Sequence, residues 1–495
     1  MTLQPLDVYD GGPEAFAPRA RWVLETLLAP LGRVPRMMRE RAAAGACALA
    51  WASEPVPGVP TLPCSDEAMD LLLGDRPLPS ASFVRRGGET GEVPGAFPVP
   101  GEGFAAPFDL VASAFVLLAC WDEHTCLERD RFGRLPFTAS IFAANPELPI
   151  DRPAVDGYVG LLRQVLEPRA AALGLEPLPD PGWVWGDGTA GAAGFAVALT
   201  HDVDNVWRWT PRGFAATGYR CARALRHGRW PALAKELGDL REWLTRHVPR
   251  HTDPLWTFPR LLGGEDARGV SSTFYVIARH THKQDGNQPA EYRRRIPVAL
   301  DMLRRGRREV GLHGNDADRL SAGELAGDRA LLAERSGAAV EGVRYHYLRC
   351  LYHATLPLVE EAGFGYDTSL AFAEHEGFRC GASFPFRPYF ITEERPLRVL
   401  ELPLAVMDTT LLEPQYRALP AAEGERATRD VLATVARTGG GVAVLWHNQR
   451  FDRRAARGYD DVYWRLVDRL REDGAFVGTA AALVRRWTER TGAPS

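Results

Sequence analysis

The sequence predicts an α/β protein built from parallel strands and helices, and two observations lead to this prediction. From about residue 190 onward, short apolar segments alternate with longer amphipathic ones, as in parallel strands joined by right-handed helical crossovers. The chain of 495 residues also exceeds what one core usually supports, so we expect more than one domain. The alternation alone fits a closed barrel and an open sheet equally.

Composition and charge narrow the class of protein. Hydrophobic residues make up 45% and charged residues 25% of the chain, which excludes a disordered chain, and the net charge of -4 gives no reason to expect nucleic acid as a partner. The seven cysteines are scattered without a C-x-x-C pair, which favours free thiols in a reducing compartment. Residues 1–7 show no signal-peptide pattern, and the longest apolar run, 110–120, is too short to span a bilayer. We therefore expect a cytoplasmic protein without a membrane span.

The first part of the chain, residues 1–185, is expected to form a smaller α/β domain of unknown role. Its middle, residues 55–107, is rich in proline and glycine, and the acids and histidine at 122–124 follow a helix and are expected to be solvated. Repeated prolines at 175–182 indicate a linker to the second domain, residues 190–490. The predicted helices of the first part are 20–31, 109–121 and 151–166.

The second domain begins with the predicted strand 194–199, which five apolar residues after a glycine indicate. A basic helical insert follows at about 211–250, and we expect it to be a solvated cover over the core. The later predicted strands are 272–277, 309–312, 342–345, 399–406, 442–446 and 476–478. The predicted helices between and after them are 289–305, 322–335, 356–362, 426–437, 460–471 and 479–489.

Polar side chains follow several of these strands at the point where each strand ends. They are Asp202 and Asp204, then His313, Arg344 with His346, and His447. A further acid, Asp408, follows the predicted strand 399–406, and no role is predicted for it. In a parallel barrel these strand ends share one face, where active sites are assembled. Asp202 and Asp204 are two residues apart, so both point to one side of an extended chain and suit one metal ligand and one base. The pattern predicts a site at this face.

The order of these motifs resembles that of the polysaccharide deacetylases, the NodB-like carbohydrate esterases, over about residues 190–490. The resemblance implies a deacetylase-type distorted (β/α) barrel. The family's first motif has the form D-x-D, which Thr200-His201-Asp202-Val203-Asp204 matches, and this implies Asp202 as catalytic base and Asp204 as metal ligand. The second motif is matched by Gly311 to Ala317 and implies His313 as a metal ligand.

The remaining motifs are matched with substitutions. R-x-P-Y becomes Arg344-Tyr345-His346-Tyr347, which implies that Arg344 orients the base and that the backbone NH of Tyr347 stabilises an oxyanion. D-x-S-x-x-W becomes Asp367 to Phe372, with phenylalanine in place of tryptophan. L-x-H becomes Leu445-Trp446-His447, which implies His447 as general acid, with Asp367 as its partner and Trp446 at the substrate.

One departure concerns the metal. The family's second histidine, four residues after the first, falls at Ala317, so the Asp-His-His ligand set is incomplete. His346 is the preferred replacement because it follows an adjacent strand, and Asp316 and Asp318 compete with it. The resemblance implies a divalent metal, zinc before others.

The implied function is a metal-dependent hydrolase that removes an acetyl group from a carbohydrate, with N-deacetylation favoured over O-deacetylation. The missing histidine motivates a rival from another class, a non-catalytic carbohydrate-binding protein that has lost the metal site. A third possibility is hydrolysis of another carbon–nitrogen bond in a substrate that is not a sugar.

Overall fold

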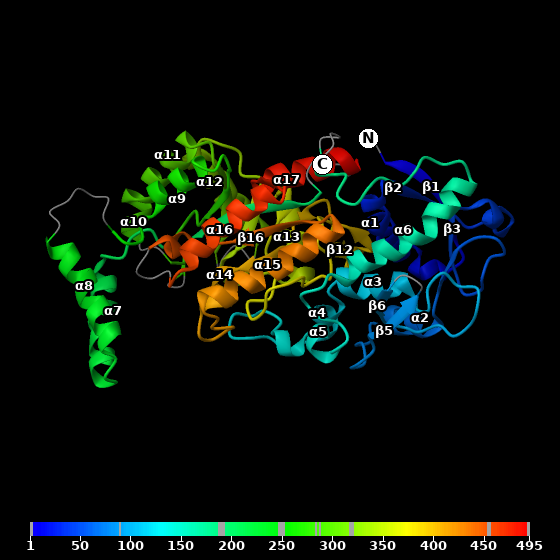
Figure 1. Cartoon of the computed structure of the whole chain (residues 1–495), viewed down its shortest axis with the longest axis horizontal. Coiled ribbons are helices and arrows are strands. Elements are labelled where there is room, and N and C mark those ends of the chain that lie inside the picture. Colours follow the sequence, from blue (N-terminus) through cyan, green and yellow to red (C-terminus); the bar gives the residue numbers. More distant parts are fainter. Residues whose placement is uncertain are drawn as a thin grey trace.

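The molecule is elongated, as the computed structural model in Figure 1 shows. The strands of the N-terminal part lie at one end, a barrel lies in the middle, and a helical hairpin projects at the other end. The structure describes residues 3–88, 91–186, 194–245, 253–282, 285–286, 289–315, 321–452 and 457–492.

The N-terminal part is an α/β unit with a parallel four-stranded sheet in the order β2-β1-β3-β4. Its longest apolar helix is α3, in which all nine residues are buried and the Asp109 side chain caps the amino end by accepting from the Ala112 NH. The strands are β1 (Gln4–Asp10), β2 (Arg33–Met38), β3 (Leu49–Ala52), β4 (Thr61–Pro63) and an antiparallel pair, β5 (Val84–Gly88) and β6 (Gly91–Gly95). The helices are α1 (Ala17–Leu28), α2 (Asp66–Leu73), α3 (Leu110–Leu118), α4 (Trp121–Thr125), α5 (Ile141–Ala144) and α6 (Ala154–Ala172).

The second part contains a parallel sheet in which the strands β11-β10-β9-β8-β7-β16 are neighbours in that order. Each of these pairs is parallel, as the alternation of strands and helices predicts. The strands are β7 (Ala196–Val203), β8 (Thr273–Val276), β9 (Glu309–Gly314), β10 (Gly342–Tyr345), β11 (Tyr366–Asp367) and β16 (Gly441–Leu445).

One short segment closes this sheet into a barrel. β14 (Leu400–Glu401) pairs with β11 at one edge, and β15 (Leu404–Met407) pairs with β16 at the other. Only Leu402 and Pro403 separate β14 from β15. The segment predicted as one strand at 399–406 therefore joins the two edges of the sheet, β11 and β16. Its register is irregular between Leu404 and Val406, which distorts the ring. The predicted distorted (β/α) barrel is confirmed, and β17 (Phe476–Gly478) adds to the start of β7.

Helices surround the barrel as predicted, but α9 and α14 were not predicted and two predicted segments are divided. The predicted helix 289–305 is divided at Arg295, just before Pro297, and the predicted insert 211–250 is two helices joined at Gly228, whose φ of 62° suits a glycine turn. The insert projects from the barrel rather than covering it (Figure 1). The helices are α7 (Pro211–Arg226), α8 (Trp230–Thr245), α9 (Phe258–Asp266), α10 (Pro289–Arg294), α11 (Ile296–Arg305), α12 (Ala322–Ser336), α13 (Tyr352–Glu361), α14 (Asp408–Leu412), α15 (Ala421–Thr438), α16 (Tyr459–Glu472) and α17 (Ala480–Thr491).

One hydrophobic core runs through both parts of the chain. The Trp22 ring lies 4.9 Å from that of Tyr389, and the Trp22 indole NH donates to the Arg387 carbonyl. The predicted boundary near residues 185–190 falls partly on 187–193, outside the described residues, and stays a prediction. All seven cysteines are free thiols. Within the described ranges, the helices are too short or too polar to cross a bilayer.

Of the two acids after α3, Glu123 is buried and Asp122 is half-buried, which corrects the expectation that they are solvated. Glu123 is 4% exposed, forms an ion pair with Arg379 and accepts a hydrogen bond from the Tyr352 NH. Asp122 is held by the Ile141 NH. The two contacts of Glu123 join the N-terminal part to the barrel, and such long-range pairing is not visible in a local sequence pattern.

Glu123→Ala is expected to lower the free energy of unfolding by about 3–5 kcal/mol, because it leaves the buried guanidinium of Arg379 without its partner. Chemical denaturation measures this loss. Asp473→Ala, which breaks an exposed ion pair with Arg469, is the control and should cost less than about 1 kcal/mol. If the two variants lose equal free energy of unfolding, the buried ion pair of Glu123 does not stabilise the fold more than an exposed pair does.

Candidate metal centre and active site

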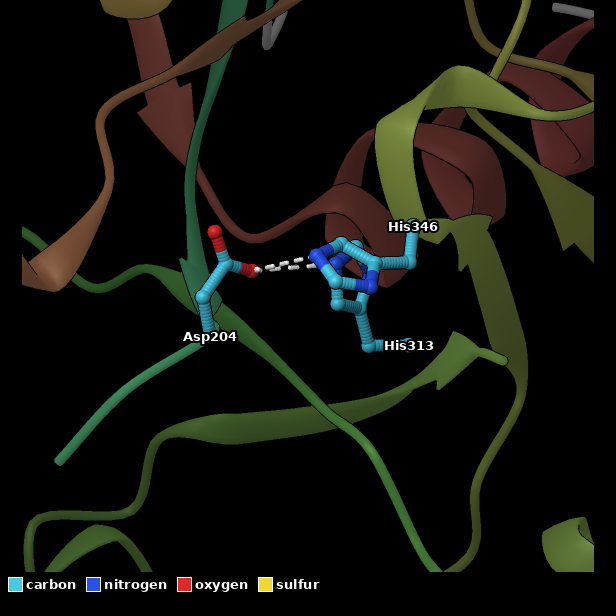
Figure 2. Close-up of side chains that lie close together, drawn as sticks. All are labelled: Asp204, His313 and His346. Atoms are coloured by element: carbon cyan, nitrogen blue, oxygen red, sulfur yellow. Dashed lines mark ion pairs between the residues drawn. The ribbon is translucent and has the colours of Figure 1, made fainter. Parts of the chain in front are cut away.

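Three side chains from the ends of three strands, β7, β9 and β10, converge at one face of the barrel (Figure 2). Asp204 directly follows β7, His313 lies in β9, and His346 begins the short helical turn after β10. The Asp204 Oδ1 atom lies 3.3 Å from His313 Nε2 and 3.6 Å from His346 Nε2. One donor atom from each residue lies within 4.8 Å of the others, so the three side chains that the sequence nominates as metal ligands are together.

The chemistry of these donors fits a divalent cation. His313 Nδ1 donates to the Arg344 carbonyl at 2.8 Å, which leaves the lone pair on Nε2, and this Nε2 and Asp204 Oδ1 are buried without a hydrogen-bond partner. Burial lowers the pKa of His346 to about 4, so its imidazole is in the neutral form that can coordinate. Ligands about 2.1 Å from a tetrahedral ion lie roughly 3.4 Å apart, close to the observed separations.

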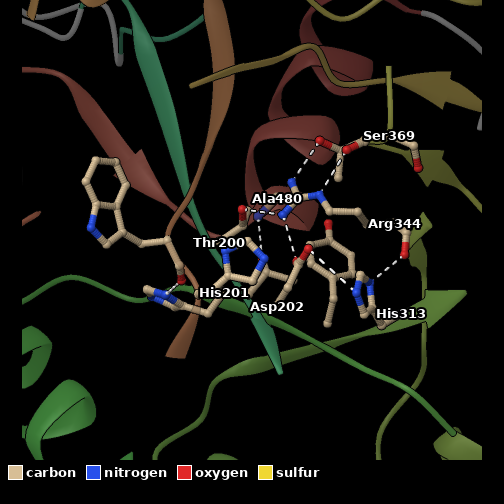
Figure 3. A network of polar contacts seen from close by, with 12 residues as sticks. Thr200, His201, Asp202, His313, Arg344, Ser369 and Ala480 are labelled. Atoms are coloured by element: carbon tan, nitrogen blue, oxygen red, sulfur yellow. Dashed lines mark hydrogen bonds and ion pairs between the residues drawn. The ribbon is translucent and has the colours of Figure 1, made fainter. Parts of the chain in front are cut away.

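Asp202 lies beside this cluster and is held by Arg344 (Figure 3). The Arg344 Nη1 atom lies 3.1 Å from Asp202 Oδ1 and 2.7 Å from the Thr200 hydroxyl oxygen. The rest of the guanidinium donates to the backbone carbonyl and hydroxyl of Thr368, so it is fixed on all sides. The second oxygen of Asp202 lies 3.8 Å from His313 Nε2. The carboxylate is therefore aimed at the space next to the candidate metal ligands.

His447 lies beside Asp204 of this cluster. Its Nε2 lies 3.6 Å from Asp204 Oδ2, and its Nδ1 lies 2.6 Å from Asp408 Oδ1. The backbone NH of His447 donates to the second Asp408 oxygen at 2.8 Å. Burial alone would lower the pKa of His447, but Asp408 and Asp204 raise it to about 9. His447 is therefore held in one orientation with its outer nitrogen toward the site.

The partner of His447 is thus Asp408, which corrects the pairing with Asp367. Asp367 is buried in β11, and its two oxygens accept from the NH and hydroxyl of Ser369 at 2.7 and 2.9 Å. The same Ser369 hydroxyl oxygen accepts from the Tyr345 NH at 3.0 Å. Asp367 therefore supports the backbone that carries Arg344 and His346 from beneath, and burial raises its pKa to about 6.

Tyr347 lines the site with its backbone in a left-handed conformation at φ 59°. Its carbonyl accepts from Arg134 Nη1 at 2.7 Å, and its ring stacks between His346, at 4.0 Å, and Phe132, at 4.8 Å. Arg349 returns a hydrogen bond to the Phe132 carbonyl. A non-glycine residue at positive φ needs such support, so residues of the N-terminal part help to shape this loop.

Trp446 does not line the site, which corrects its predicted place at the substrate. It is fully buried, its indole NH donates to the Tyr459 carbonyl at 3.0 Å, and its own carbonyl accepts from His201 Nδ1 at 2.6 Å. Alternation along an extended chain explains this, since Trp446 and His447 point to opposite sides. Asp316 and Asp318, the competing ligand candidates, lie outside the described residues.

Two kinds of site residue were missed by sequence reasoning. Asp408 had a visible signal, because it is an acid directly after a predicted strand, like Asp202 and Asp204. Arg134 and Phe132 had none, since they lie more than two hundred positions before Tyr347 in the chain and only the tertiary structure brings them together.

The chain is similar to one protein family over part of its length and to several solved structures. A model of a family of unknown function, DUF7033, matches residues 68–171, and no curated protein matches the chain. Among solved structures, the chain is similar to a probable polysaccharide deacetylase from Pseudomonas aeruginosa PAO1 at 16% identity, over 63% of this chain and 95% of that one, with a TM-score of 0.40. It is similar to Puue allantoinase at 15% identity, over 64% and 95%, with a TM-score of 0.41.

A third similar structure is BA3943, a CE4 family pseudoenzyme from Bacillus anthracis, at 11% identity over 58% of this chain and 65% of that one, with a TM-score of 0.30. The DUF7033 match lies wholly in the N-terminal part of the chain. It includes Phe132 and Arg134, the two residues of that part that contact Tyr347 at the site.

Proposed function

We propose that the chain is a metal-dependent hydrolase that removes an acetyl group from a carbohydrate, with an N-acetyl group favoured over an O-acetyl group. One observation carries the proposal. The candidate ligands Asp204, His313 and His346 lie beside a carboxylate fixed by an arginine, Asp202, and beside an imidazole fixed by a carboxylate, His447. The motif resemblance supports the carbohydrate as substrate.

Asp204, His313 and His346 would hold the cation through one oxygen and two imidazole nitrogens. This donor set is typical of zinc sites that keep a position open for water or substrate. A cation bound there supplies Lewis acidity, which polarises the acyl carbonyl and lowers the pKa of bound water to about 7.

Asp202 would act as the base that takes a proton from the attacking water. Arg344 fixes the direction of the Asp202 oxygens, because its guanidinium donates a hydrogen bond to Oδ1. The backbone NH of Tyr347 would donate to the developing oxyanion, a kind of contact worth about 3–4 kcal/mol of the barrier.

His447 would donate a proton to the leaving amine, which otherwise departs as an unfavourable anion. Asp408 accepts from Nδ1 of the ring, so the proton that is transferred is the one on Nε2, which faces the site. Arg450, whose Nε lies 3.4 Å from Asp408 Oδ2, keeps that carboxylate in place. Asp202 and His447 would therefore each carry out one of the two proton transfers.

The test is acetate release from a panel of acetylated sugars by protein stripped with a chelator and then supplied with zinc. Metal-dependent release supports the proposal. Elemental analysis of protein purified without chelator separates the rival function, because a protein that only binds carbohydrate should hold no stoichiometric divalent ion. A protein that binds carbohydrate but holds no metal and releases no acetate would contradict the proposal.

His346→Ala is expected to lower the affinity for zinc by at least about 100-fold, because it removes one of three protein ligands. Competition with a fluorescent chelator measures the affinity. His280→Ala, which changes a histidine outside the cluster, is the control. Unchanged zinc affinity in His346→Ala would show that the third ligand is another residue.

Arg134→Ala is expected to weaken zinc binding by about tenfold, since it frees the Tyr347 carbonyl and loosens the loop that carries His346. The control is Arg131→Ala, which removes a nearby arginine that also lies over the Phe132 ring, whereas the hydrogen bond to the Tyr347 carbonyl comes from Arg134. If the two variants bind zinc equally well, the N-terminal part does not position the ligand.

A further inference from the structure

The helical hairpin of α7 and α8 has a surface that the proposed function does not use. It projects away from the barrel at one end of the molecule (Figure 1). Its base is fixed, because the Arg208 guanidinium pairs with Glu236 and Asp239 and the ring of Trp209 lies 5.9 Å from that of Trp243. The rest of the hairpin therefore stands in a defined direction.

The outer side of α8 carries an apolar stripe. Trp230, Leu237 and Leu244 recur every seven residues, so they lie along one side of the helix over about 21 Å. Their side chains are 65%, 49% and 59% exposed. Glu236 and Asp239, on the other side of α8, are buried and mark where the hairpin packs on itself and on Arg208. Exposed leucines and tryptophan at regular spacing are typical of a surface that binds a partner.

The hairpin is also basic, although the chain as a whole has a net charge of -4. Residues 211–245 include seven arginine or lysine residues and three acids. Two of the acids, Glu236 and Asp239, are buried against Arg208. The arginines nearest the tip, Arg223, Arg226 and Arg229, are exposed and precede Trp230 in the chain. The outward charge of this surface is therefore positive.

These two features together select the partner. A second copy of the chain would bring one basic hairpin against another, which like-charge repulsion disfavours. Nucleic acid would match the positive charge, but proteins bind it mainly through polar contacts to phosphate and sugar, which a stripe of leucines does not provide. A membrane surface with anionic headgroups matches both, since the exposed tryptophan and leucines of α8 suit the boundary between headgroups and acyl chains and the arginines of α7 and of the turn before Trp230 supply the positive charge.

We propose that the α7–α8 hairpin docks the protein on a membrane surface that is rich in anionic lipid. Trp230, Leu237 and Leu244 insert at the boundary between headgroups and acyl chains. Arg223, Arg226 and Arg229 contact the lipid phosphates. The docking surface and the candidate active site lie on different elements, so this proposal does not depend on the proposed function.

The test is sedimentation of the full-length protein with vesicles of phosphatidylcholine alone or mixed with phosphatidylglycerol. We expect binding to the mixed vesicles, weaker binding at high salt and little binding to phosphatidylcholine alone. Leu237→Ser combined with Leu244→Ser should weaken binding at least about tenfold. Reversal of Arg223, Arg226 and Arg229 to glutamate should weaken it by about 100-fold or more.

Matched controls keep the result interpretable. Leu127→Ser changes an exposed leucine away from the hairpin, which is 92% exposed, and Arg293→Glu with Arg294→Glu and Arg426→Glu makes the same charge change elsewhere. These controls should bind like wild type, and circular dichroism should show that all variants fold. Failure of the wild type to bind mixed vesicles overturns the proposal and favours an acidic protein partner. A dimer that Leu237→Ser and Leu244→Ser dissociate overturns it in favour of a second copy.

Discussion

Asp202→Asn is expected to lower kcat for acetate release by about 10³-fold, because an amide cannot accept a proton from the attacking water. The asparagine keeps an oxygen that can accept from Arg344, and Asp202 is not one of the three clustered ligands. Metal content should therefore stay close to that of the wild type. A steady-state assay on an acetylated sugar measures the first effect, and elemental analysis measures the second.

The matched control is Asp468→Asn, which changes an aspartate that pairs with Arg268 far from the site. Its kcat should equal that of the wild type. Substantial turnover by Asp202→Asn with bound metal would rule out Asp202 as the base. Loss of metal in this variant would instead place Asp202 among the ligands.

His447→Ala is expected to lower kcat for N-acetyl substrates by about 10³-fold while changing the hydrolysis of 4-nitrophenyl acetate less than about tenfold. The reason is the leaving group: an amine must be protonated as it departs, whereas nitrophenolate leaves as a stable anion. Parallel assays on the two substrates measure the ratio. Asp202→Asn should slow both reactions, because both need the attacking water to lose a proton.

Asp408 and Asp367 provide an internal comparison for this prediction. Asp408→Asn should show the same selective loss on amides, by about tenfold or more, because it orients the His447 ring. Asp367→Asn should affect the two substrates alike, since Asp367 contacts Ser369 and not His447. An equal loss on amide and ester in His447→Ala would contradict the role of His447 as acid.

Most elements of the barrel could be predicted because each depends on neighbours in the sequence, but the two-residue strand β11 was not predicted. The strand β10 was predicted at the residues where it occurs, and β9 within two residues, since a short apolar run bounded by polar residues is a local signal. The division of 399–406 into β14 and β15 could not be predicted. Whether that segment pairs with one neighbour or with two depends on how the whole sheet curves.

For the candidate site too, some residues could be predicted from the sequence and others could not. Asp202, Asp204, His313 and His447 could be nominated because parallel strand ends meet at one face, whatever the order of the strands. The choice of Asp408 over Asp367 could not be made in this way, because both acids lie at strand ends. In the structure, Asp408 directly follows β15. Because β15 pairs with β16, which His447 follows closely, the Asp408 carboxylate lies beside His447.

The sequence by itself thus determined which strands end in ionisable side chains, because the alternation of apolar and polar residues is a property of neighbouring positions. Only the tertiary structure decided that His346 meets Asp204 and His313, that Trp446 is buried, and that Arg134 holds Tyr347. These contacts join residues far apart in the chain. Their distances are set by sheet curvature and by the packing of the N-terminal part on the barrel, and no local pattern records either.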